Sequence, residues 1–498
     1  MNHPQPMPVL LAIDQSTSAT KAILFDDTGR VLDQAARAHR QYYPQPGWVE
    51  HDAAEIWRNV LEVVCELAGR NHDSFNRLAG LSLTNQRETV VVFDRKTGEP
   101  LHPAMVWQCR RGEELCTRLR AQGLEGPVSQ KTGLKIDTYF SGSKLKWLVA
   151  AHPGLAARLA AGDALIGTMD AYLVYRLTQG AVFATDHTNA SRTLLYNLEH
   201  LAWDDALCGW FDVPRAALPE VRESSARYGE TDIDGILPRG IPIVGVMGDS
   251  QAALFAQQCF SPGMVKATLG TGTSVLLNVG PQCPRPEPGA VTALAWVWRG
   301  EPVYAREGII NYSAATLEWL RHQLGLIQDL KDVEALAGSV PDNAGVYLVP
   351  AFSGLSAPYW SPGARAALVG LTAHTRREHI VRAALESIAY QIRDVLDMLR
   401  REAGVPVKML RADGGPTRNH LLMQFIADLA GVSIEVPEVP EASAWGAAMN
   451  GWLALGRYSS LADLPPLPPA AKAFHPLMSA ELVVKNYSGW QAAVQRVL

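Results

Sequence analysis

The sequence predicts an α/β protein built from two related halves that meet near residues 250–260. Apolar strand patterns alternate with amphipathic helix patterns along the chain, which is typical of α/β folds. The order of elements restarts near residue 240, where a buried strand, a Gly-Asp turn and an alanine-rich helix follow one another. We therefore predict two domains, over residues 1–254 and 255–498, on the strength of a matching pattern rather than of repeated residues.

The first half opens with strands and continues into a helix. Short apolar runs predict its strands, over residues 9–14, 20–26, 30–36, 78–84 and 90–94. A helix is predicted over 51–70, because its apolar residues recur every three to four positions. Asp52 and Glu55 at its start fit a capping box. Strands followed by a helix and further strands resemble the ribonuclease-H-like pattern of sugar kinases, actin and Hsp70-type ATPases.

The second half repeats this alternation of strands and helices. Its predicted elements are a strand and helix over 241–255, two strands over 264–280, a strand over 292–298, a helix over 314–324, a strand over 345–352, a helix over 378–403, and a strand and helix over 408–431. The turn within 264–280 carries hydroxyls at its tip, as does the first turn of the chain. The two halves are therefore expected to be related α/β domains.

Composition limits the classes of function. The 498 residues are 47% apolar and 19% charged, which predicts large cores. The net charge of −5 and the lack of a basic block argue against nucleic acid as a partner. No apolar run approaches the ~20 residues of a membrane helix, and the N-terminus lacks the pattern of a secretion signal. The six cysteines form no CxxC pair, so we expect free thiols in a reducing cytoplasm.

Three turns rich in hydroxyls or glycine each follow an apolar strand, at Asp14–Ser18, Gly270–Ser274 and Asp413–Thr417. Small residues let backbone N–H groups approach phosphate oxygens, and hydroxyls add further donors. Other nucleotide motifs are missing: there is no GxxxxGK[ST], and Val275 stands where a dinucleotide fingerprint needs its third glycine. Three such turns predict a nucleotide held in a cleft between the halves.

Charged residues at strand ends are the candidates for catalysis. Asp14 and Asp249 both end buried strands, where a carboxylate can hold magnesium or accept a proton from a hydroxyl. The alternative for each is a helix-capping aspartate, and a helix does follow Asp249 directly. Arg87 and Glu88 place a donor fork beside an acceptor, which suits neighbouring hydroxyls of a polyol. Their alternative is a surface ion pair of little energetic value.

Several longer segments carry a resemblance to a known family. They lie at residues 85–89, 107–111, 138–148, 188–197, 248–257 and 349–360, and in the stretches "FSGSKLKW" and "ALVGLTAHTRREHIVRAALES". In collinear order over nearly the whole chain, these segments resemble the FGGY carbohydrate kinases. The resemblance implies two actin-like domains with ATP and Mg²⁺ in the cleft between them, and a small polyol or sugar as the second substrate.

The resemblance also implies a role for each matching residue. Asp249 would be the general base, and Asp14 would help to place magnesium. The residues implied to line the polyol are Arg87, Glu88, Trp107, Tyr139, Asp249, Ser250 and Ser274. The residues implied to contact the nucleotide are Thr17, Ser18, Lys21, Thr271, Ala314, Glu318, Gly415 and Asn419. The expected reaction is phosphorylation of a primary hydroxyl of the polyol by ATP.

This chain departs from the glycerol-phosphorylating members of the family at several positions. Ser250 stands where they usually have a glutamine, and Ser274 where they have a phenylalanine, which implies a roomier and more polar pocket. Lys21 replaces their usual arginine and keeps the charge without the fork. Gly240 stands in place of the arginine with which enteric members bind a sugar-bisphosphate inhibitor.

These departures leave several interpretations open. Glycerol is the first candidate substrate on whole-chain similarity, and a four- or five-carbon polyol or ketose such as erythritol or xylulose is the alternative. An actin- or Hsp70-like ATPase and a catalytically idle relative are the rival classes. The sequence is compatible with a homo-oligomer, a dimer or a tetramer, and does not decide between them.

Overall fold

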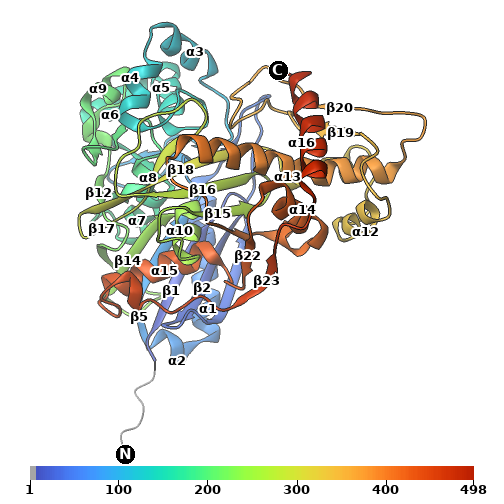
Figure 1. The fold of residues 1–498 in the computed structure, drawn as a ribbon. Helices are drawn as coiled ribbons and strands as arrows, with labels where there is room; N and C mark the ends of the chain where they lie inside the picture. The colour runs from blue at the N-terminus through green and yellow to red at the C-terminus, as the bar shows by residue number, and fades with distance from the viewer. Residues whose placement is uncertain (1–6) are drawn as a thin grey trace, which may run out of the picture.

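The computed structural model describes residues 7–498 and shows two halves, each built on one large sheet (Figure 1). The first sheet has the strand order β13-β14-β5-β1-β2-β3. Its strands are β1 (Val9–Gln15), β2 (Ala19–Asp26), β3 (Val31–Ala38), β5 (Leu78–Asn85), β13 (Arg227–Thr231) and β14 (Ile241–Gly248). β1 pairs antiparallel with β2 and parallel with β5, which in turn pairs parallel with β14. The expectation about a secretion signal concerns in part residues 1–6, which lie outside the described residues.

The second sheet has the order β17-β18-β16-β15-β21-β22-β23. Its strands are β15 (Met264–Leu269), β16 (Thr273–Gly280), β17 (Val291–Trp298), β18 (Glu301–Ile310), β21 (Met409–Asp413), β22 (Ile434–Pro437) and β23 (Ala470–Phe474). The run β18-β16-β15-β21-β22 has the same order and strand directions as β3-β2-β1-β5-β14 in the first sheet. The predicted duplication is therefore present in the topology.

The helices lie around these sheets. Those before residue 249 are α1 (Ala53–Arg70), α2 (His72–Phe75), α3 (Glu113–Ala121), α4 (Glu125–Thr132), α5 (Ser141–Ala151), α6 (Pro153–Ala161), α7 (Met169–Leu177), α8 (His187–Ala190) and α9 (Asp205–Trp210). Those after it are α10 (Asp249–Ala256), α11 (Ala314–His322), α12 (Val333–Gly338), α13 (Arg377–Glu402), α14 (His420–Ala430), α15 (Ala442–Ala454) and α16 (Ala480–Gln495). The long helix α13 runs across the second sheet (Figure 1).

Shorter strands complete the fold. A four-stranded sheet of order β4-β7-β6-β8 contains β4 (Glu50–His51), β6 (Val90–Asp94), β7 (Ala104–Met105) and β8 (Ala164–Thr168). The two-stranded pairs are β9 (Ala184–Asp186) with β12 (Glu220–Arg222), β10 (Tyr196–Asn197) with β11 (Ala202–Trp203), and β19 (Tyr347–Val349) with β20 (Ala367–Val369). These short strands form sheets that are separate from the two large ones.

The start of α1 differs from the sequence prediction in one detail. Asp52 does cap the helix, because its Oδ1 accepts the N–H of Ala54 at 2.9 Å. Glu55 does not complete the capping box, since its Oε1 accepts the N–H of Arg40 at 3.4 Å instead. The backbone N–H of Arg40 therefore takes the place of the N-cap N–H as the donor to Glu55. The local sequence gives no sign of this contact.

Two helices join the halves. α10 and α15 pack against each other between the sheets, within an apolar cluster that includes Leu10 of β1, Leu276 of β16 and Trp452 of α15. Their close approach requires a glycine, because a Cβ at Gly446 would lie 1.9 Å from the carbonyl oxygen of Ala252. α15 follows the second sheet in sequence yet covers β14, β5 and β1 of the first sheet. The expected boundary after residue 254 falls inside α10.

Two buried histidines predict acid sensitivity. Burial lowers the pKa of His51 and of His187 from 6.5 to about 4, and both side chains are at most 9% exposed. Between pH 6.5 and about 4 the unfolded chain takes up protons that the folded chain refuses, so stability falls as pH falls. Each histidine should contribute a loss of about 2 kcal/mol in the free energy of unfolding between pH 7 and pH 5.

Urea unfolding at both pH values measures this loss. His51→Gln should reduce it by about the share of one histidine, and the exposed His200→Gln should leave it unchanged. An unchanged loss in His51→Gln would contradict the assignment.

Candidate active site

The three turns singled out in the sequence lie at corresponding strand ends. The first joins β1 to β2, the second joins β15 to β16, and the third follows β21 beside β15. The third is packed tightly on the second strand pair, because a Cβ at Gly414 would lie 1.9 Å from the carbonyl oxygen of Leu269. The first turn reaches the second half through Lys21, whose Nζ lies 2.6 Å from Glu441 Oε2. The topology therefore brings the turns of both halves to one junction.

Asp14 and Asp249 lie near each other at this junction. Burial raises the pKa of Asp14 to about 7, and the charges of Asp249 and Glu441 add to this against the opposing effect of Lys21. The Oδ1 atom of Asp14 is buried and has no hydrogen-bond partner in the protein. Burial also raises the pKa of Asp249, against the opposing charges of Arg87 and Lys266. Both carboxylates are thus in surroundings that favour added positive charge.

Asp249 is not a helix cap. It is the first residue of α10, and its Oδ1 accepts the N–H of Ser250 at 2.6 Å, one position ahead. A capping side chain would accept from an N–H two or three positions ahead. The side chain is 34% exposed, and Arg87 Nε lies 3.4 Å from its Oδ1. Asp249 therefore presents a partly open carboxylate beside a guanidinium.

Arg87 and Glu88 are buried, so the surface ion-pair interpretation is wrong. Their side chains are 4% and 2% exposed. Arg87 Nη2 donates to Glu307 Oε1 at 2.8 Å, and Nη1 donates to Gln251 Oε1 at 3.1 Å. Glu88 Oε1 accepts from Arg192 Nε at 2.6 Å. Burial raises the pKa of Glu88, against the opposing charges of Arg87 and Arg192.

Sequence reasoning missed Arg192 and Glu307. Arg192 Nη1 lies 2.7 Å from Glu307 Oε2, and neither side chain is exposed. Burial alone would raise the pKa of Glu307, but the guanidiniums of Arg192 and Arg87 outweigh it and lower that pKa to about 2. Arg192 lies inside the recognised segment 188–197, which was a usable signal. Glu307 is one acid within the ten-residue strand β18, and nothing nearby in the sequence marks it.

Trp107 and Tyr139 form an aromatic wall beside this cluster. Their ring centroids are 5.3 Å apart, and Trp107 Nε1 donates to Thr17 Oγ1 at 3.0 Å. The segment that carries Tyr139 is held by Lys144, whose buried Nζ donates to the carbonyl oxygens of residues 138–140 at 2.8, 2.7 and 3.1 Å. The first turn and the aromatic wall are therefore tied together.

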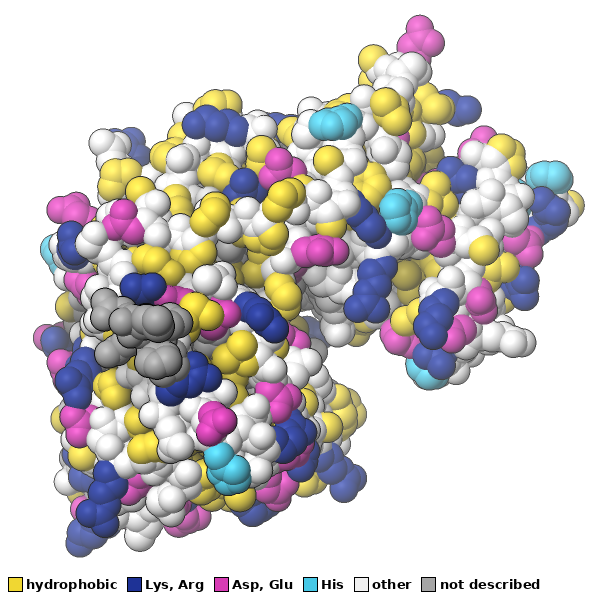
Figure 2. Space-filling view, turned by 90° about the horizontal axis from the view of Figure 1, so that it is seen from below, with side chains coloured by type: hydrophobic (Ala, Val, Ile, Leu, Met, Phe, Trp, Pro, Cys, Tyr) yellow, Lys and Arg dark blue, Asp and Glu magenta, His cyan; other side chains and the backbone are white. Residues whose placement is uncertain are grey.

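A cavity of ≈ 800 Å³ opens between the halves. Trp107 and Tyr139 line it from the first half, and Thr271, Asn311 and Trp360 line it from the second. Seen from below, the molecule has a lobe that projects to one side of the main body, and Lys and Arg are mixed among Asp and Glu over this face (Figure 2). The cavity brings the predicted polyol wall and the second turn together.

Ser250 and Ser274 are both half-buried. The Ser274 hydroxyl donates to Glu307 Oε1 at 2.8 Å. The side chain of Ser250 lies one residue beyond the Asp249 carboxylate at the start of α10. Both positions thus adjoin the charged cluster.

The residues expected to contact the nucleotide are partly engaged within the protein. Thr271 accepts the N–H of Ala315 through its carbonyl oxygen at 3.2 Å, which seats α11 on the second turn. Asn419 caps α14, since its Oδ1 accepts the N–H of Leu422 at 2.9 Å. Glu318 pairs with His322 at 3.1 Å. Thr17 and Ser18 lie at the first turn, Lys21 lies in β2, Ala314 begins α11 and Gly415 follows β21.

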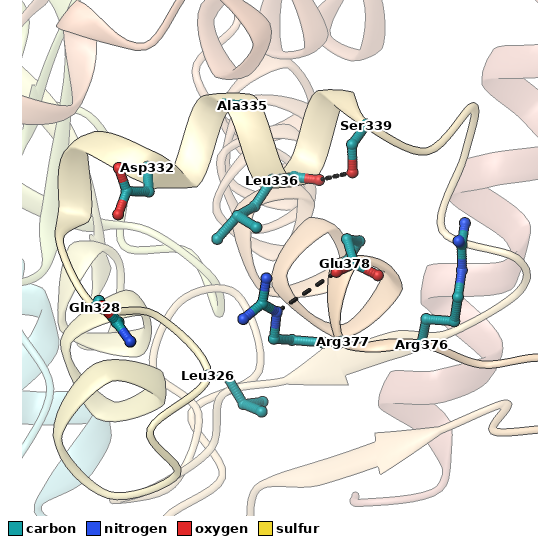
Figure 3. Close-up of a pocket in the computed structure, with 9 residues that line it drawn as sticks. All are labelled: Leu326, Gln328, Asp332, Ala335, Leu336, Ser339, Arg376, Arg377 and Glu378. Atoms are coloured by element: carbon teal, nitrogen blue, oxygen red, sulfur yellow. Dashed lines mark hydrogen bonds and ion pairs between the residues drawn. The ribbon is translucent and has the colours of Figure 1, made fainter.

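A second hollow, of ≈ 580 Å³, shares no lining residue with the cavity between the halves (Figure 3). It is lined by residues of α12 and by the start of α13. Within it, Arg377 Nε and Glu378 Oε1 are 3.5 Å apart, and Ser339 Oγ donates to the Leu336 carbonyl oxygen at 2.7 Å. None of the predicted site residues lines it. Of the predicted site residues, Trp107, Tyr139 and Thr271 line the cavity between the halves, whereas Arg87, Glu88 and Asp249 do not. Glu88 and Arg87 lie close to Tyr139, so this cavity together with the charged cluster beside it is the candidate active site.

A duplicated sheet topology, with hydroxyl- and glycine-rich turns of both halves at one junction, is the ribonuclease-H-like architecture that sugar kinases share with actin and Hsp70-type ATPases. Residues 9–256 match the N-terminal domain, and residues 265–455 the C-terminal domain, of the FGGY family of carbohydrate kinases. The chain belongs to this family. The rival actin- and Hsp70-like ATPases are thereby excluded.

Individual relatives are similar over the full length. The glycerol kinase of Desulfitobacterium hafniense is 46% identical over 489 residues, which cover 98% of this chain and 99% of that one. The glycerol kinase of Halorhodospira halophila is 48% identical over 487 residues, covering 98% and 96%. A crystal structure of Plasmodium falciparum glycerol kinase with ADP superimposes with a TM-score of 0.91 at 36% identity, covering 99% of this chain and 98% of that one. Over residues 7–498, no helix has the length and apolar character to cross a membrane.

Proposed function

We propose that this kinase transfers the γ-phosphoryl group of ATP to a primary hydroxyl of a small polyol, with glycerol as the first candidate. The observation that carries the polyol assignment is the buried Arg87–Glu88 pair next to the partly open Asp249 carboxylate. Charged donors and acceptors in one buried site match the alternating needs of neighbouring hydroxyls. The full-length similarity to relatives named glycerol kinase supports glycerol in particular.

In the proposed reaction, Asp249 accepts the proton of the attacking hydroxyl. Arg87 and Glu88 orient the polyol, while Trp107 and Tyr139 cover its carbon chain, so the nucleophile is held in line with the phosphoryl group. Such positioning supplies much of the acceleration in phosphoryl transfer. Exclusion of water by the cleft strengthens each electrostatic contact.

The nucleotide would lie on the turns of both halves. Backbone N–H groups and hydroxyls at Thr17, Ser18 and Thr271 are suited to phosphate oxygens, with Lys21 as the nearby cation. Ala314, Glu318, Gly415 and Asn419 would face the nucleoside or the α-phosphate. The relative from Plasmodium falciparum was solved with ADP, which supports an adenine nucleotide as a ligand of this fold.

Magnesium fits the residues present. The unpartnered, buried Oδ1 of Asp14 is a hard oxygen ligand of the kind that Mg²⁺ takes, and Mg²⁺ in kinases binds one or two carboxylates together with substrate phosphates. Among residues 7–498, no group of three or more His, Cys, Asp or Glu side chains is arranged so that it could bind a metal ion by itself. Asp14 would therefore hold the ion, which when bound neutralises charge on the phosphates.

Two further assignments complete the proposal. All six cysteines are free, which is compatible with the reducing cytoplasm that we propose as the compartment. We also keep the division into a polyol- and phosphate-binding domain, 1–254, and a nucleotide-binding domain, 255–498. A homo-oligomer stays a prediction.

A screen of substrates tests the proposal directly. ADP release should be measured with glycerol, erythritol, xylitol, ribitol, xylulose and ribulose. Glycerol should give the highest kcat/KM. The small hydroxyls of Ser250 and Ser274 favour the second candidate, a four- or five-carbon polyol or ketose, and a higher kcat/KM for one of these would select it. ADP release that no polyol or sugar stimulates would reject both.

Asp249→Asn tests the general base. The amide keeps the size of the side chain but cannot accept the proton, so kcat should fall by roughly 10²-fold or more. Nucleotide affinity and thermal stability should stay close to those of the wild type. Near-normal turnover would show that Asp249 has no part in proton transfer.

Arg87→Ala tests the polyol site. Removal of the guanidinium should raise the KM for the polyol about 10-fold or more, the usual scale for a charged hydrogen bond. The KM for ATP should stay within about twofold, because Arg87 lies outside the three phosphate-type turns. Equal losses for both substrates would place Arg87 in the phosphate site or in the scaffold; circular dichroism controls for folding.

A further inference from the structure

Glu307 lies in the second half of the chain, but its carboxylate binds arginine side chains of the first half. Its Oε1 accepts from Arg87 Nη2 at 2.8 Å, and its Oε2 lies 3.4 Å from Arg87 Nη1 and 2.7 Å from Arg192 Nη1. The side chain is 0% exposed. Glu307 is therefore shielded from any molecule in the cavity and acts only through the groups that it binds.

The contacts of Arg87 show what Glu307 holds in place. Both terminal nitrogens are taken, since Nη2 binds Glu307 and Nη1 binds Glu307 and Gln251. The remaining nitrogen, Nε, faces the reactive side of the site, 3.4 Å from Asp249 and 4.0 Å from Glu88. When one carboxylate binds both terminal nitrogens of a planar guanidinium, the guanidinium cannot rotate. Glu307 thus sets the plane in which Arg87 presents Nε.

We infer that Glu307 is a positioning residue for the polyol site, and that Ser274 in turn positions Glu307. This inference rests on the proposed function and adds the residues that orient Arg87. Because Glu307 and Ser274 lie on β18 and β16 of the second sheet and Arg87 follows β5 of the first, the polyol site is assembled only when the halves hold this arrangement.

Ser274 has one hydroxyl hydrogen, and it is used. It points to Glu307 Oε1, so the hydroxyl can accept from a ligand but cannot donate to one. A chain with an apolar side chain at this position would leave that oxygen of Glu307 with Arg87 alone. Ser274 therefore tightens the Glu307–Arg87 contact rather than supplying a donor to the polyol.

Three single variants test the inference in the full chain, with the best polyol of the screen. Glu307→Gln keeps the shape and removes the charge, and should raise the polyol KM about 10-fold or more while the ATP KM stays within about twofold. Ser274→Ala should change the polyol KM in the same direction by about 3- to 10-fold. Glu301→Gln, at an exposed position of the same strand, is the matched control and should change neither KM.

A double-mutant cycle separates positioning from a general structural role. If Glu307 acts through Arg87, then Glu307→Gln should cost less than about threefold in polyol kcat/KM when Arg87 is already alanine. Additive losses, an unchanged polyol KM in Glu307→Gln, or equal increases in the polyol and ATP KM would overturn the inference.

Two outcomes keep the test decisive. Should Glu307→Gln fail to fold, Ser274→Ala decides alone, because it removes one hydroxyl from a half-buried site; an unchanged polyol KM there overturns the inference. If the wild type phosphorylates no polyol, the proposed function fails and this inference falls with it. If the wild type is active and the variants behave like Glu301→Gln, the inference alone fails.

Discussion

The structure depends on the pairing of four buried charges at the junction of its halves. Arg87, Arg192 and Glu88 come from the first half and Glu307 from the second, and each side chain is at most 4% exposed. An ion removed from water without a partner costs several kcal/mol, so these groups are stable only together. Two cations and two anions cancel, which lets the cluster sit in the interior. The same pairing holds Glu307 of the second sheet against Arg87 and Arg192 of the first half.

The fold was largely predictable because the hydrophobic periodicity of the sequence and the order of its strands and helices indicate it. Alternation of strands and helices, repeated after residue 240, predicted two halves of one topology, and the paired sheets confirm the prediction. Contacts between distant segments were not predictable. α15 follows the second sheet in sequence but packs on the first sheet, and Glu55 accepts the N–H of Arg40 instead of completing the expected capping box. Both depend on where the chain returns in space, which local patterns do not encode.

The site was predictable where residues stand at strand ends. Asp14 lies at the end of a buried strand, Arg87, Glu88 and Asp249 follow one, and the fold brings such ends together at one junction. Glu307 was missed because it lies within a strand, where an acid has no local signature. The role of Glu307 depends on its contacts with Arg87 and Arg192, which are 220 and 115 residues away in the chain. Resemblance to a family names single positions, whereas this contact is a property of their arrangement in space.

The charge balance at the cleft explains why the two carboxylates need different partners. Asp249 has Arg87 at 3.4 Å, so its negative charge is partly compensated within the protein. Asp14 has no hydrogen-bond partner for Oδ1, and the nearby Lys21 is shared with Glu441 at 2.6 Å. Phosphates placed beside such an uncompensated carboxylate would be repelled, because like charges in a low-dielectric site interact strongly. In the proposed mechanism, Asp14 would hold a divalent cation, which would compensate this negative charge. Under the same proposal Asp249 would remain free to accept a proton, so that the two acids would serve separate purposes at one junction.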